Sequence, residues 1–447
     1  MNLSVDIRPS VPLGSALVES EREQAAPRPG RNRTAQTTWQ SAIPHAPDYA
    51  LLTITLALLC VGIVMVYSAS LVVGYAEFGD QAYFFQRQLL WSGLGLAVMF
   101  LFMRIPYRHW RRVSLLGLLV SVGLLVAILV PGLGSQALGA TRWIQVGGVK
   151  IGQPSELAKV VIVLYMADWL AHKGQRVREF GYGLVPFAVV LSLIVALLIK
   201  QPDMGTALVI IATAVSIFYV SGASLLQLLP CGAAAVGVLG WLAMTSGYRH
   251  GRIEAFIDPW RDPSNSGYHI IQSLIALGTG GIRGVGLGVS RQKFGLLPFP
   301  YTDSIFAVIG EELGLIGCTA ILALFLLLAY RGLLAARRAP DSFGALLAVG
   351  ISCQIAVQAF LNIAVVTSTV PFTGITLPFV SYGGSSMLVS FAAMGILLNV
   401  TQYGRDRKEA VGEESPAAPA SRRRHRWPPL SGAGRGAGRQ RPATRRG

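Results

Sequence analysis

The segment ALLTITLALLCVGIVMVYSA (50–69) holds twenty residues without a single charged side chain. An α-helix needs about 20 such residues to cross the hydrocarbon core of a bilayer. Nine further apolar segments follow along the chain: 85–103, 113–131, 154–171, 182–199, 204–220, 225–245, 304–330, 343–370 and 381–402. The sequence therefore predicts an all-α, polytopic membrane helix bundle of about ten transmembrane helices, with a long outer loop before the eighth.

Composition agrees with a membrane protein and excludes a soluble domain. Charged residues make up 13% of the chain and hydrophobic residues 52%, whereas soluble domains carry about a quarter charged residues. We expect three parts: a disordered cytoplasmic tail over 1–48, a transmembrane domain over 49–403 and a disordered Arg-rich cytoplasmic tail over 404–447.

The basic residues between the spans predict how the chain is oriented. Three loops rich in Arg and Lys, 104–112, 172–181 and 331–341, alternate with loops that are poor in them. Cytoplasmic loops carry an excess of these residues, so both termini are expected in the cytoplasm and the long loop 246–303 outside. Within that loop, 267–281 predicts a short interfacial or re-entrant helix that ends at a glycine.

The C-terminal tail holds nine arginines and no acidic residue between Arg422 and Arg446. Such a run is typical either of nucleic-acid binding or of contact with anionic lipid headgroups. Because the chain ahead of it is anchored in a membrane, we expect membrane lipids as the partner and no nucleic acid.

Charged residues beside the spans are the candidate functional groups, because they are costly in a bilayer. In RWIQVGGVKIGQPSELAK (142–159), Glu156 and Lys159 are three residues apart and lie on one helical face. They are interpreted either as an ion pair that locks helix packing or as the wall of a hydrophilic cavity. Arg142 and Trp143 precede them, and Trp143 by itself is typical of an interfacial anchor.

Two more groups of charges are expected at the same outer face. The turn between the fifth and sixth spans holds Lys200 and Asp203, and Asp203 fits a helix cap equally well. Asp303 precedes the eighth span, where it fits either an N-cap or a position over the cavity. Arg291 and Lys293, in the same loop, supply positive charge for a pyrophosphate.

Polar residues deeper in the spans complete the set. Glu311 and Glu312 lie about two turns into the eighth span. Two adjacent carboxylates inside an apolar helix are energetically costly, and the sequence offers no structural role that would offset this cost. The string TLPFVSYGGSSMLVSF (376–391) contains Ser381, a candidate substrate contact. Its small residues 383–386 fit either close helix packing or an anion site at a helix N-terminus.

These strings resemble the SEDS family (shape, elongation, division and sporulation), the FtsW/RodA/SpoVE group. The resemblance covers about residues 50–403, and four strings in family order carry it: RWIQVGGVKIGQPSELAK (142–159), QPDMGTAL (201–208), the Asp303 string with GEELGLIG (310–317), and NIAVVTSTVPFTGITLPFVSYGGSS (362–386). Within the group, the segment 255–295 is most similar to the division branch, FtsW, rather than to RodA.

The resemblance implies a peptidoglycan glycosyltransferase that polymerises lipid II during cell division, in the bacterial plasma membrane at the septum. Asp303 aligns with the family's essential aspartate, and Trp143 with an important tryptophan. Four positions fall on the lining of the family's central cavity: Glu156, Lys159, Lys200 and Asp203. The implied partners are lipid II, the undecaprenyl-pyrophosphate-linked glycan, a class B penicillin-binding protein transpeptidase and other divisome proteins.

One string departs from the family's pattern. Pro-Glu-x-His-Thr-Asp is usual before the eighth span, whereas this chain reads LPFPYTD (297–303). Phe299 stands in place of the Glu and Tyr301 in place of the His, so two polar groups that bear on the family's local proton network and on any metal contact are missing here.

The expected reaction begins when Asp303 removes a proton from the sugar hydroxyl of an incoming lipid II. That hydroxyl attacks the anomeric carbon of the growing strand, and undecaprenyl pyrophosphate leaves. Basic side chains would stabilise its charge, or a divalent cation (Mg²⁺ or Mn²⁺) bridging the phosphates; no dedicated metal cage is expected. Two alternatives are a lipid II flippase, for which Glu311 and Glu312 are the best support, and a non-catalytic divisome scaffold.

Overall fold

The computed structural model describes residues 45–404, apart from 133, 138–139, 147–148, 225 and most of 230–246. Nine long helices coincide with predicted spans: α3 (Tyr49–Phe78), α4 (Tyr83–Arg104), α5 (Arg108–Ala127), α6 (Pro154–Lys173), α7 (Val185–Lys200), α8 (Met204–Val220), α12 (Ile305–Arg338), α13 (Ser342–Val366) and α14 (Gly384–Gln402). Six of the described helical segments are long and apolar enough to cross a membrane. The predicted polytopic helical fold is confirmed; the seventh span, 225–245, and the two predicted tails lie largely outside the described residues.

Local sequence signals begin and end several of these helices. Asp48 begins α3 by accepting hydrogen bonds from the backbone N–H groups of Ala50 (3.0 Å) and Leu51 (3.2 Å). Pro154 begins α6, a position where its missing N–H costs nothing. Asp341 caps α13 through the N–H of Gly344 (3.1 Å). These caps satisfy donors that lipid would leave without partners.

Short helical elements lie between the spans. A 3₁₀ turn, η2 (Gly174–Arg178), and a π turn, η3 (Phe180–Leu184), connect α6 to α7. The long loop before α12 contains α10 (Gly247–Ile257), the 3₁₀ turn η4 (Pro259–Arg261) and α11 (Tyr268–Gly280). The predicted short helix over 267–281 is therefore confirmed as α11, and it ends at Gly281, whose φ of 54° suits glycine.

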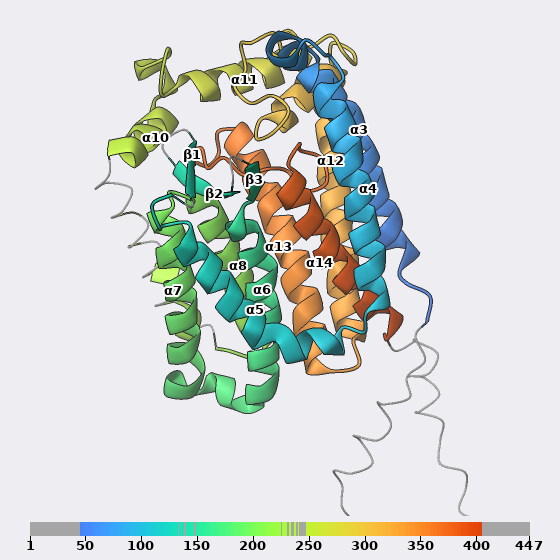
Figure 1. Ribbon diagram of the computed structural model, residues 1–447, viewed down its shortest axis with the longest axis vertical. Helices are drawn as coiled ribbons and strands as arrows, with labels where there is room; N and C mark the ends of the chain where they lie inside the picture. The colour runs from blue at the N-terminus through green and yellow to red at the C-terminus, as the bar shows by residue number, and fades with distance from the viewer. Residues whose placement is uncertain are drawn as a thin grey trace, which may run out of the picture. The chain divides into compact units, whose positions relative to one another are not determined.

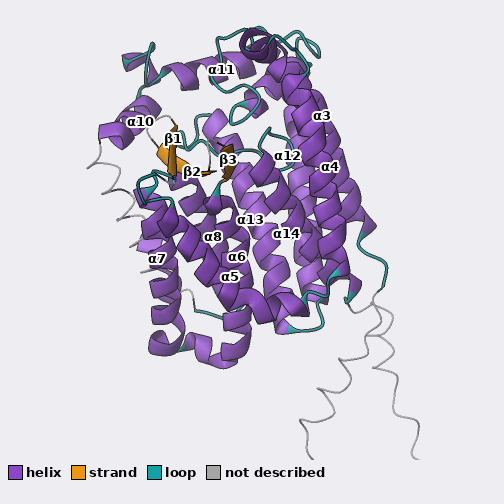
Figure 2. Ribbon diagram, viewed as in Figure 1, coloured by secondary structure: helices purple, strands orange, loops and turns teal. Residues whose placement is uncertain are grey.

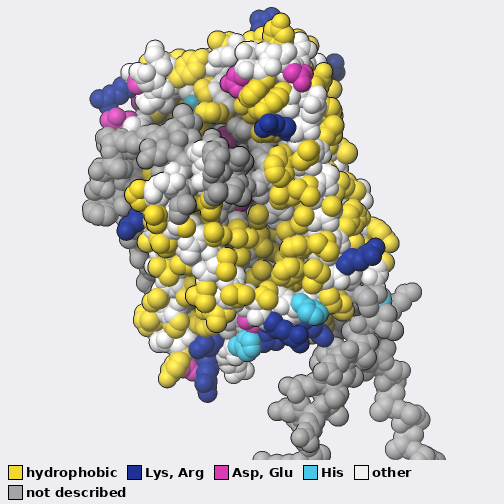
Figure 3. Space-filling model, in the orientation of Figure 1, with side chains coloured by type: hydrophobic (Ala, Val, Ile, Leu, Met, Phe, Trp, Pro, Cys, Tyr) yellow, Lys and Arg dark blue, Asp and Glu magenta, His cyan; other side chains and the backbone are white. Residues whose placement is uncertain are grey.

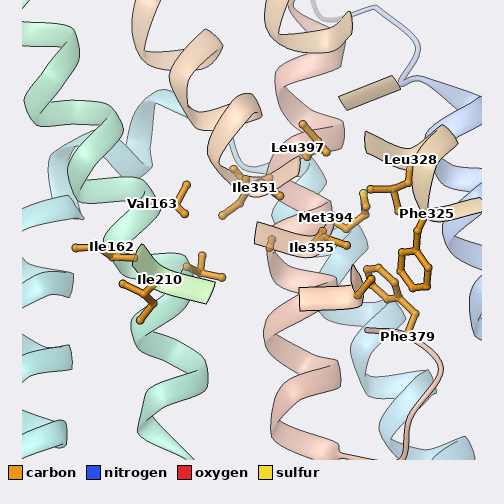
Figure 4. Packing of buried hydrophobic residues seen from close by; sticks show 14 of the residues in the cluster. Ile162, Val163, Ile210, Phe325, Leu328, Ile351, Ile355, Phe379, Met394 and Leu397 are labelled. Atoms are coloured by element: carbon orange, nitrogen blue, oxygen red, sulfur yellow. The ribbon is translucent and has the colours of Figure 1, made fainter. Parts of the chain in front are cut away.

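The long helices pack side by side (Figure 1). Helix α4 packs against α14, α12 against α13, and α6 contacts α5, α8 and α13. Figure 4 shows the apolar core between them, with Ile162 and Val163 from α6 and Phe325 from α12. Close approach of α4 and α14 depends on Gly395, where a Cβ would lie 2.4 Å from the carbonyl oxygen of Met99. Small residues of this kind let membrane helices gain packing energy that lipid alone does not provide.

Both ends of the described bundle lie together at its lower end in Figure 1. The N–H of His45 donates to the carbonyl of Gln402 (2.7 Å). Asp48 forms an ion pair with Arg331 (2.7 Å). The sequence placed Arg331 in an Arg-rich loop, whereas the structure extends α12 to Arg338, so Arg331 lies in the last turns of that helix. Lys and Arg side chains gather at this end below a band of hydrophobic side chains (Figure 3). The C-terminal part of α12 and the two ends of the described chain therefore lie at one end of the bundle.

A small antiparallel sheet, in the order β1 (Gly134–Ala137), β2 (Ala140–Val146), β3 (Val149–Gly152), lies at the opposite end of the bundle (Figure 2). Its register pairs Ile144 with Gly152 and Val146 with Val149. Sequence analysis treated this region as a loop, so the strands are an addition to the all-α expectation. The signal was present in RWIQVGGVKIG (142–152), because two alternating strings flank a Gly-Gly pair.

Helix α12 is broken at Gly314, whose φ of 68° is outside the helical range. The segment after α11 fills the break with four backbone hydrogen bonds: Val285 to Glu311, Gly286 to Glu312, Leu315 to Gly281 and Ile316 to Ile282. A Cβ on Gly314 would lie 2.3 Å from the nitrogen of Gly284. The break thus fixes the start of the loop that leads to Asp303.

Candidate active site

A cavity of about 530 Å³ lies at the end of the bundle opposite the chain ends. It forms where α6, α8 and α14 begin, beneath the sheet residues Arg142 and Trp143. Its lining consists of Arg87, Trp91, Arg142, Trp143, Gly152, Gln153, Glu156, Asp203, Thr206, Phe299, Thr302, Asp303, Gly374, Ile375, Thr376, Tyr382, Gly383, Gly384, Ser385, Ser386 and Leu388. The volume falls in the range of small-molecule sites, and five predicted site residues meet in it: Arg142, Trp143, Glu156, Asp203 and Asp303.

Asp303 lies half-buried in the cavity, at the end of the loop before α12. The N-cap position of α12 belongs to Ser304, and no side chain caps this helix, so the alternative reading of Asp303 as an N-cap does not apply. Enclosure by protein raises the pKa of Asp303 to about 6; Arg142 and Arg252 lower it in part, and Asp203 raises it. Such a carboxylate is ionised at neutral pH and is still basic enough to accept a proton.

Arg142 and Asp303 approach each other across Gly374. A Cβ at Gly374, where φ is 71°, would lie 3.4 Å from Asp303 Oδ2 and 4.0 Å from Arg142 Nη1. Arg142 also donates to the carbonyl of Pro202, which holds its guanidinium over the cavity wall. The site therefore places a cation beside the candidate base, separated by a residue without a side chain.

Asp203 fulfils both roles that the sequence left open. It caps α8 through the N–H of Thr206 (3.3 Å) and also lines the cavity. It accepts hydrogen bonds from Ser155 Oγ (2.8 Å) and Gln153 Nε2 (3.2 Å) as well. These contacts hold the Asp203 side chain in place and leave Asp303 as the more available carboxylate.

Glu156 and Lys159 form the ion pair that their spacing predicts. Lys159 Nζ lies 2.9 Å from Glu156 Oε2, and both side chains are buried. Glu156 lines the cavity, whereas Lys159 lies behind it and donates to Gln358 Oε1 (2.6 Å). Both interpretations of the pair therefore apply: it is a buried ion pair, and one of its members, Glu156, also lines the cavity.

Besides Lys159, four predicted residues lie outside the lining that the described residues form. Lys200 and Arg291 are exposed. Ser381 is buried and donates to the carbonyl of Thr302 (2.7 Å), next to Asp303. Lys293 is buried elsewhere, 3.1 Å from Glu312.

Glu311 and Glu312 are held in a closed cluster with the turn that contains Lys293. Glu311 accepts hydrogen bonds from Ser290 Oγ and from the N–H groups of Arg291 (2.9 Å) and Gln292 (3.3 Å). Glu312 accepts from Ser68 Oγ (2.6 Å) as well as from Lys293. These partners supply the structural explanation that sequence analysis lacked, and they account for both carboxylates without a polar path across the membrane.

Arg87 and Trp91 also line the cavity, from α4, and were not among the site residues predicted from the sequence. The signal was Arg87 itself, a charge inside the predicted span 85–103, which marks a functional candidate. The first turn of α14, residues 383–386, also lines the cavity, and no side chain caps it. Free N–H groups at a helix N-terminus are suited to anions.

A divalent cation would find little protein ligation here. No group of three His, Cys, Asp or Glu side chains that suits a metal occurs in the described part of the chain. Asp203 and Glu156 are already engaged, so Asp303 is the one carboxylate of the described lining that fits a cation. This donor set matches a cation held chiefly by substrate phosphates.

The family model of the FtsW/RodA/SpoVE group, described as a cell cycle protein, matches residues 49–406. The chain belongs to this family. A family member from Bacillus subtilis, stage V sporulation protein E, is 44% identical over 360 residues, which cover 80% of this chain and 98% of that relative. A Geobacter metallireducens member named probable peptidoglycan glycosyltransferase FtsW is 45% identical over 354 residues, covering 79% and 94%.

Solved structures of family members have the same fold. A structure described as "Structural coordination of polymerization and crosslinking by a peptidoglycan synthase complex" matches with a TM-score of 0.65 and 29% identity, over 80% of this chain and 98% of that one. The rod shape determining protein RodA of Thermus thermophilus matches with a TM-score of 0.60 and 27% identity, over 81% and 98%. The membrane bundle is therefore the fold of the FtsW/RodA/SpoVE family.

Proposed function

We propose that this protein is a peptidoglycan glycosyltransferase that polymerises lipid II into glycan strands during cell division. The observation that carries the proposal is Asp303, a carboxylate of raised pKa in a polar cavity at one end of a membrane bundle, beside Arg142. A relative of 45% identity bears the name of this activity. The location suits a substrate whose headgroup is polar and whose tail stays in the bilayer.

In the proposed reaction, Asp303 accepts the proton of the acceptor sugar hydroxyl. The hydroxyl oxygen forms a bond to the anomeric carbon of the growing strand. The bond from that carbon to the pyrophosphate oxygen breaks, and its electron pair leaves with undecaprenyl pyrophosphate. Arg142, Arg87 and the N-terminus of α14 lie where they would stabilise this negative charge.

A Mg²⁺ or Mn²⁺ ion, if bound, would neutralise charge on the leaving pyrophosphate. Asp303 is the residue that would touch it, and the substrate phosphates would supply the remaining oxygens. Removal of divalent cations by chelation separates this possibility from stabilisation by the arginines alone.

The same proposal includes the protein's setting in the cell. It puts both termini on the cytoplasmic side of the bacterial plasma membrane; the support is Arg331, a basic residue of α12 that pairs with Asp48 near one end of the described chain. The cavity then opens at the outer face, at the division septum. The partner is a class B penicillin-binding protein transpeptidase among other divisome proteins; a solved neighbour belongs to a peptidoglycan synthase complex.

The flippase alternative loses its main sequence support, because Glu311 and Glu312 are engaged in the closed cluster with Lys293 and Ser68. The scaffold alternative depends on the two tails. A scaffold needs no charged residues inside the bundle, whereas several charged side chains line this cavity.

The test uses the full chain with its class B transpeptidase partner in detergent, labelled lipid II and a divalent cation. Unsubstituted protein should form glycan polymer on a gel, and Asp303→Ala should form none while its thermal unfolding stays unchanged. Asp258→Ala, an exposed aspartate of the outer loop, is the matched control and should retain activity. Polymer from Asp303→Ala would refute the assigned base. No polymer from any variant would favour the flippase, to be tested by lipid II translocation in liposomes.

A further inference from the structure

Three consecutive backbone carbonyls lead up to α12, and each accepts a hydrogen bond from a different group. Tyr301 accepts from the N–H of Tyr382 (2.9 Å). Thr302 accepts from Ser381 Oγ (2.7 Å), and Asp303 accepts from Asn362 Nδ2 (2.8 Å). The carboxylate of Asp303 is therefore positioned by its own backbone, which is fixed from outside the loop.

Asn362 lies on α13, behind the cavity, and is buried. Its amide nitrogen also donates to the carbonyl of Ile375 (2.7 Å), a residue of the cavity lining. One side chain thus joins the backbone that carries the base to the loop that forms the facing wall.

Gln358 repeats this contact one turn earlier on α13, again as a buried side chain. Its Nε2 donates to the carbonyl of Thr376 (3.0 Å), and its Oε1 accepts from Lys159 Nζ. Lys159 in turn holds Glu156 at 2.9 Å. Residues four apart lie on one helical face, so α13 connects the two acidic sides of the cavity through two amides.

We propose that Asn362 and Gln358 are positioning residues, which set where Asp303 stands relative to Glu156 and the loop 373–376. The proposal rests on the glycosyltransferase function proposed above. Neither side chain belongs to the described lining, so each acts through the groups that it holds. Hydrogen bonds of this kind are strong in a low-dielectric interior, and a displacement of about 1 Å at a reacting group costs roughly a hundredfold in rate.

Gln354 provides a matched control on the same helix. It lies four residues before Gln358 and is equally buried. Its Oε1 has no partner among the described residues, whereas Gln358 Oε1 accepts from Lys159. Asn362→Leu, Gln358→Met and Gln354→Met each replace a buried amide by an apolar side chain of similar size. Comparison of the three separates loss of the contacts from loss of a buried amide.

The first measurement is the initial rate of polymerisation against lipid II concentration, with thermal unfolding recorded for each variant. Asn362→Leu and Gln358→Met should lower kcat by roughly ten- to a hundredfold with KM little changed, because the groups that touch substrate remain. Gln354→Met should retain the kcat of unsubstituted protein. Full kcat in Asn362→Leu, or an equal loss in all three variants, would overturn the proposal.

A second measurement does not depend on activity. Asp303→Cys places a thiol at the base position, and its rate of modification by a methanethiosulfonate reagent is followed by mass spectrometry of that peptide. Adding Asn362→Leu should change this rate severalfold, whereas adding Gln354→Met should not; equal rates in all backgrounds would overturn the proposal. If unsubstituted protein forms no polymer, the proposed glycosyltransferase function is contradicted. The positioning role of Asn362 is still tested in that case, because the thiol modification rates do not depend on activity.

Discussion

At the scale of single residues, Asp303 stands between opposing effects on its proton affinity. Enclosure disfavours the ionised form, and Arg142 and Arg252 favour it. Enclosure prevails, so the pKa is about 6 instead of the value of about 4 usual for aspartate. The two arginines therefore keep more of Asp303 ionised, and so able to accept a proton, than enclosure alone would allow.

The rate of polymerisation should follow this pKa. Below pH 6 the base is protonated, so kcat/KM should fall about tenfold per pH unit on the acid side, with an apparent pKa of about 6. Arg142→Gln removes a charge that lowers the pKa of Asp303, so its acid limb should move to higher pH. The control is Lys200→Gln, which changes an exposed cation outside the cavity and should leave the limb in place. An acid limb that Arg142→Gln does not move would contradict this account of the site.

At the scale of elements, the break in α12 and the cluster beside it act together. The segment after α11 fills the break with backbone hydrogen bonds, and the turn at 290–293 is then held by Glu311 and Glu312. Irregular backbone survives at membrane depth only where protein satisfies it. The loop that carries Asp303 therefore begins from a fixed point.

Breaking the buried pair should destabilise the protein strongly. Lys293→Met or Glu312→Gln alone leaves an uncompensated group and should cost about 3–5 kcal/mol, whereas the double substitution should cost less than the sum. Thermal unfolding of the unsubstituted protein, the two single variants and the double variant in one detergent measures the interaction energy between Lys293 and Glu312. Arg261→Gln, in an exposed pair with Glu254 at 3.4 Å, should show no measurable change. Additive losses would mean that Lys293 and Glu312 do not interact.

At the scale of the whole molecule, the two ends of the helix bundle differ. The chain ends lie with Arg331 at one end, and the cavity lies at the other. In the topology proposed above, with this Arg-bearing end in the cytoplasm, the cavity would face outward, where a lipid-linked sugar on the outer leaflet could reach it.

Substituted cysteines test this orientation in intact cells. A membrane-impermeant maleimide should label Asp262→Cys, in the long loop, from outside. Arg337→Cys should be labelled only after the membrane is permeabilised, because it lies in the last turn of α12, at the proposed cytoplasmic end of the bundle. Both sites are assayed by mass spectrometry against unsubstituted protein, and labelling of Arg337→Cys in intact cells would reverse the proposed topology.

The sequence by itself predicted the spans well, because bilayer crossing depends on the length and polarity of each segment alone. It also predicted the Glu156–Lys159 ion pair, since i,i+3 spacing on one helix is a local property. It treated the sheet around Trp143 as a loop, although the alternation in that string was a usable signal.

Which charges face the cavity was decided only by the tertiary structure. Lys293 precedes the eighth predicted span and Arg87 lies inside the second; Lys293 is paired with Glu312, whereas Arg87 lines the cavity. Likewise, Asn362 and Asp303 are 59 residues apart in sequence and are joined by a hydrogen bond. Local spacing determines which residues share a helix face, whereas long-range packing determines what that face meets.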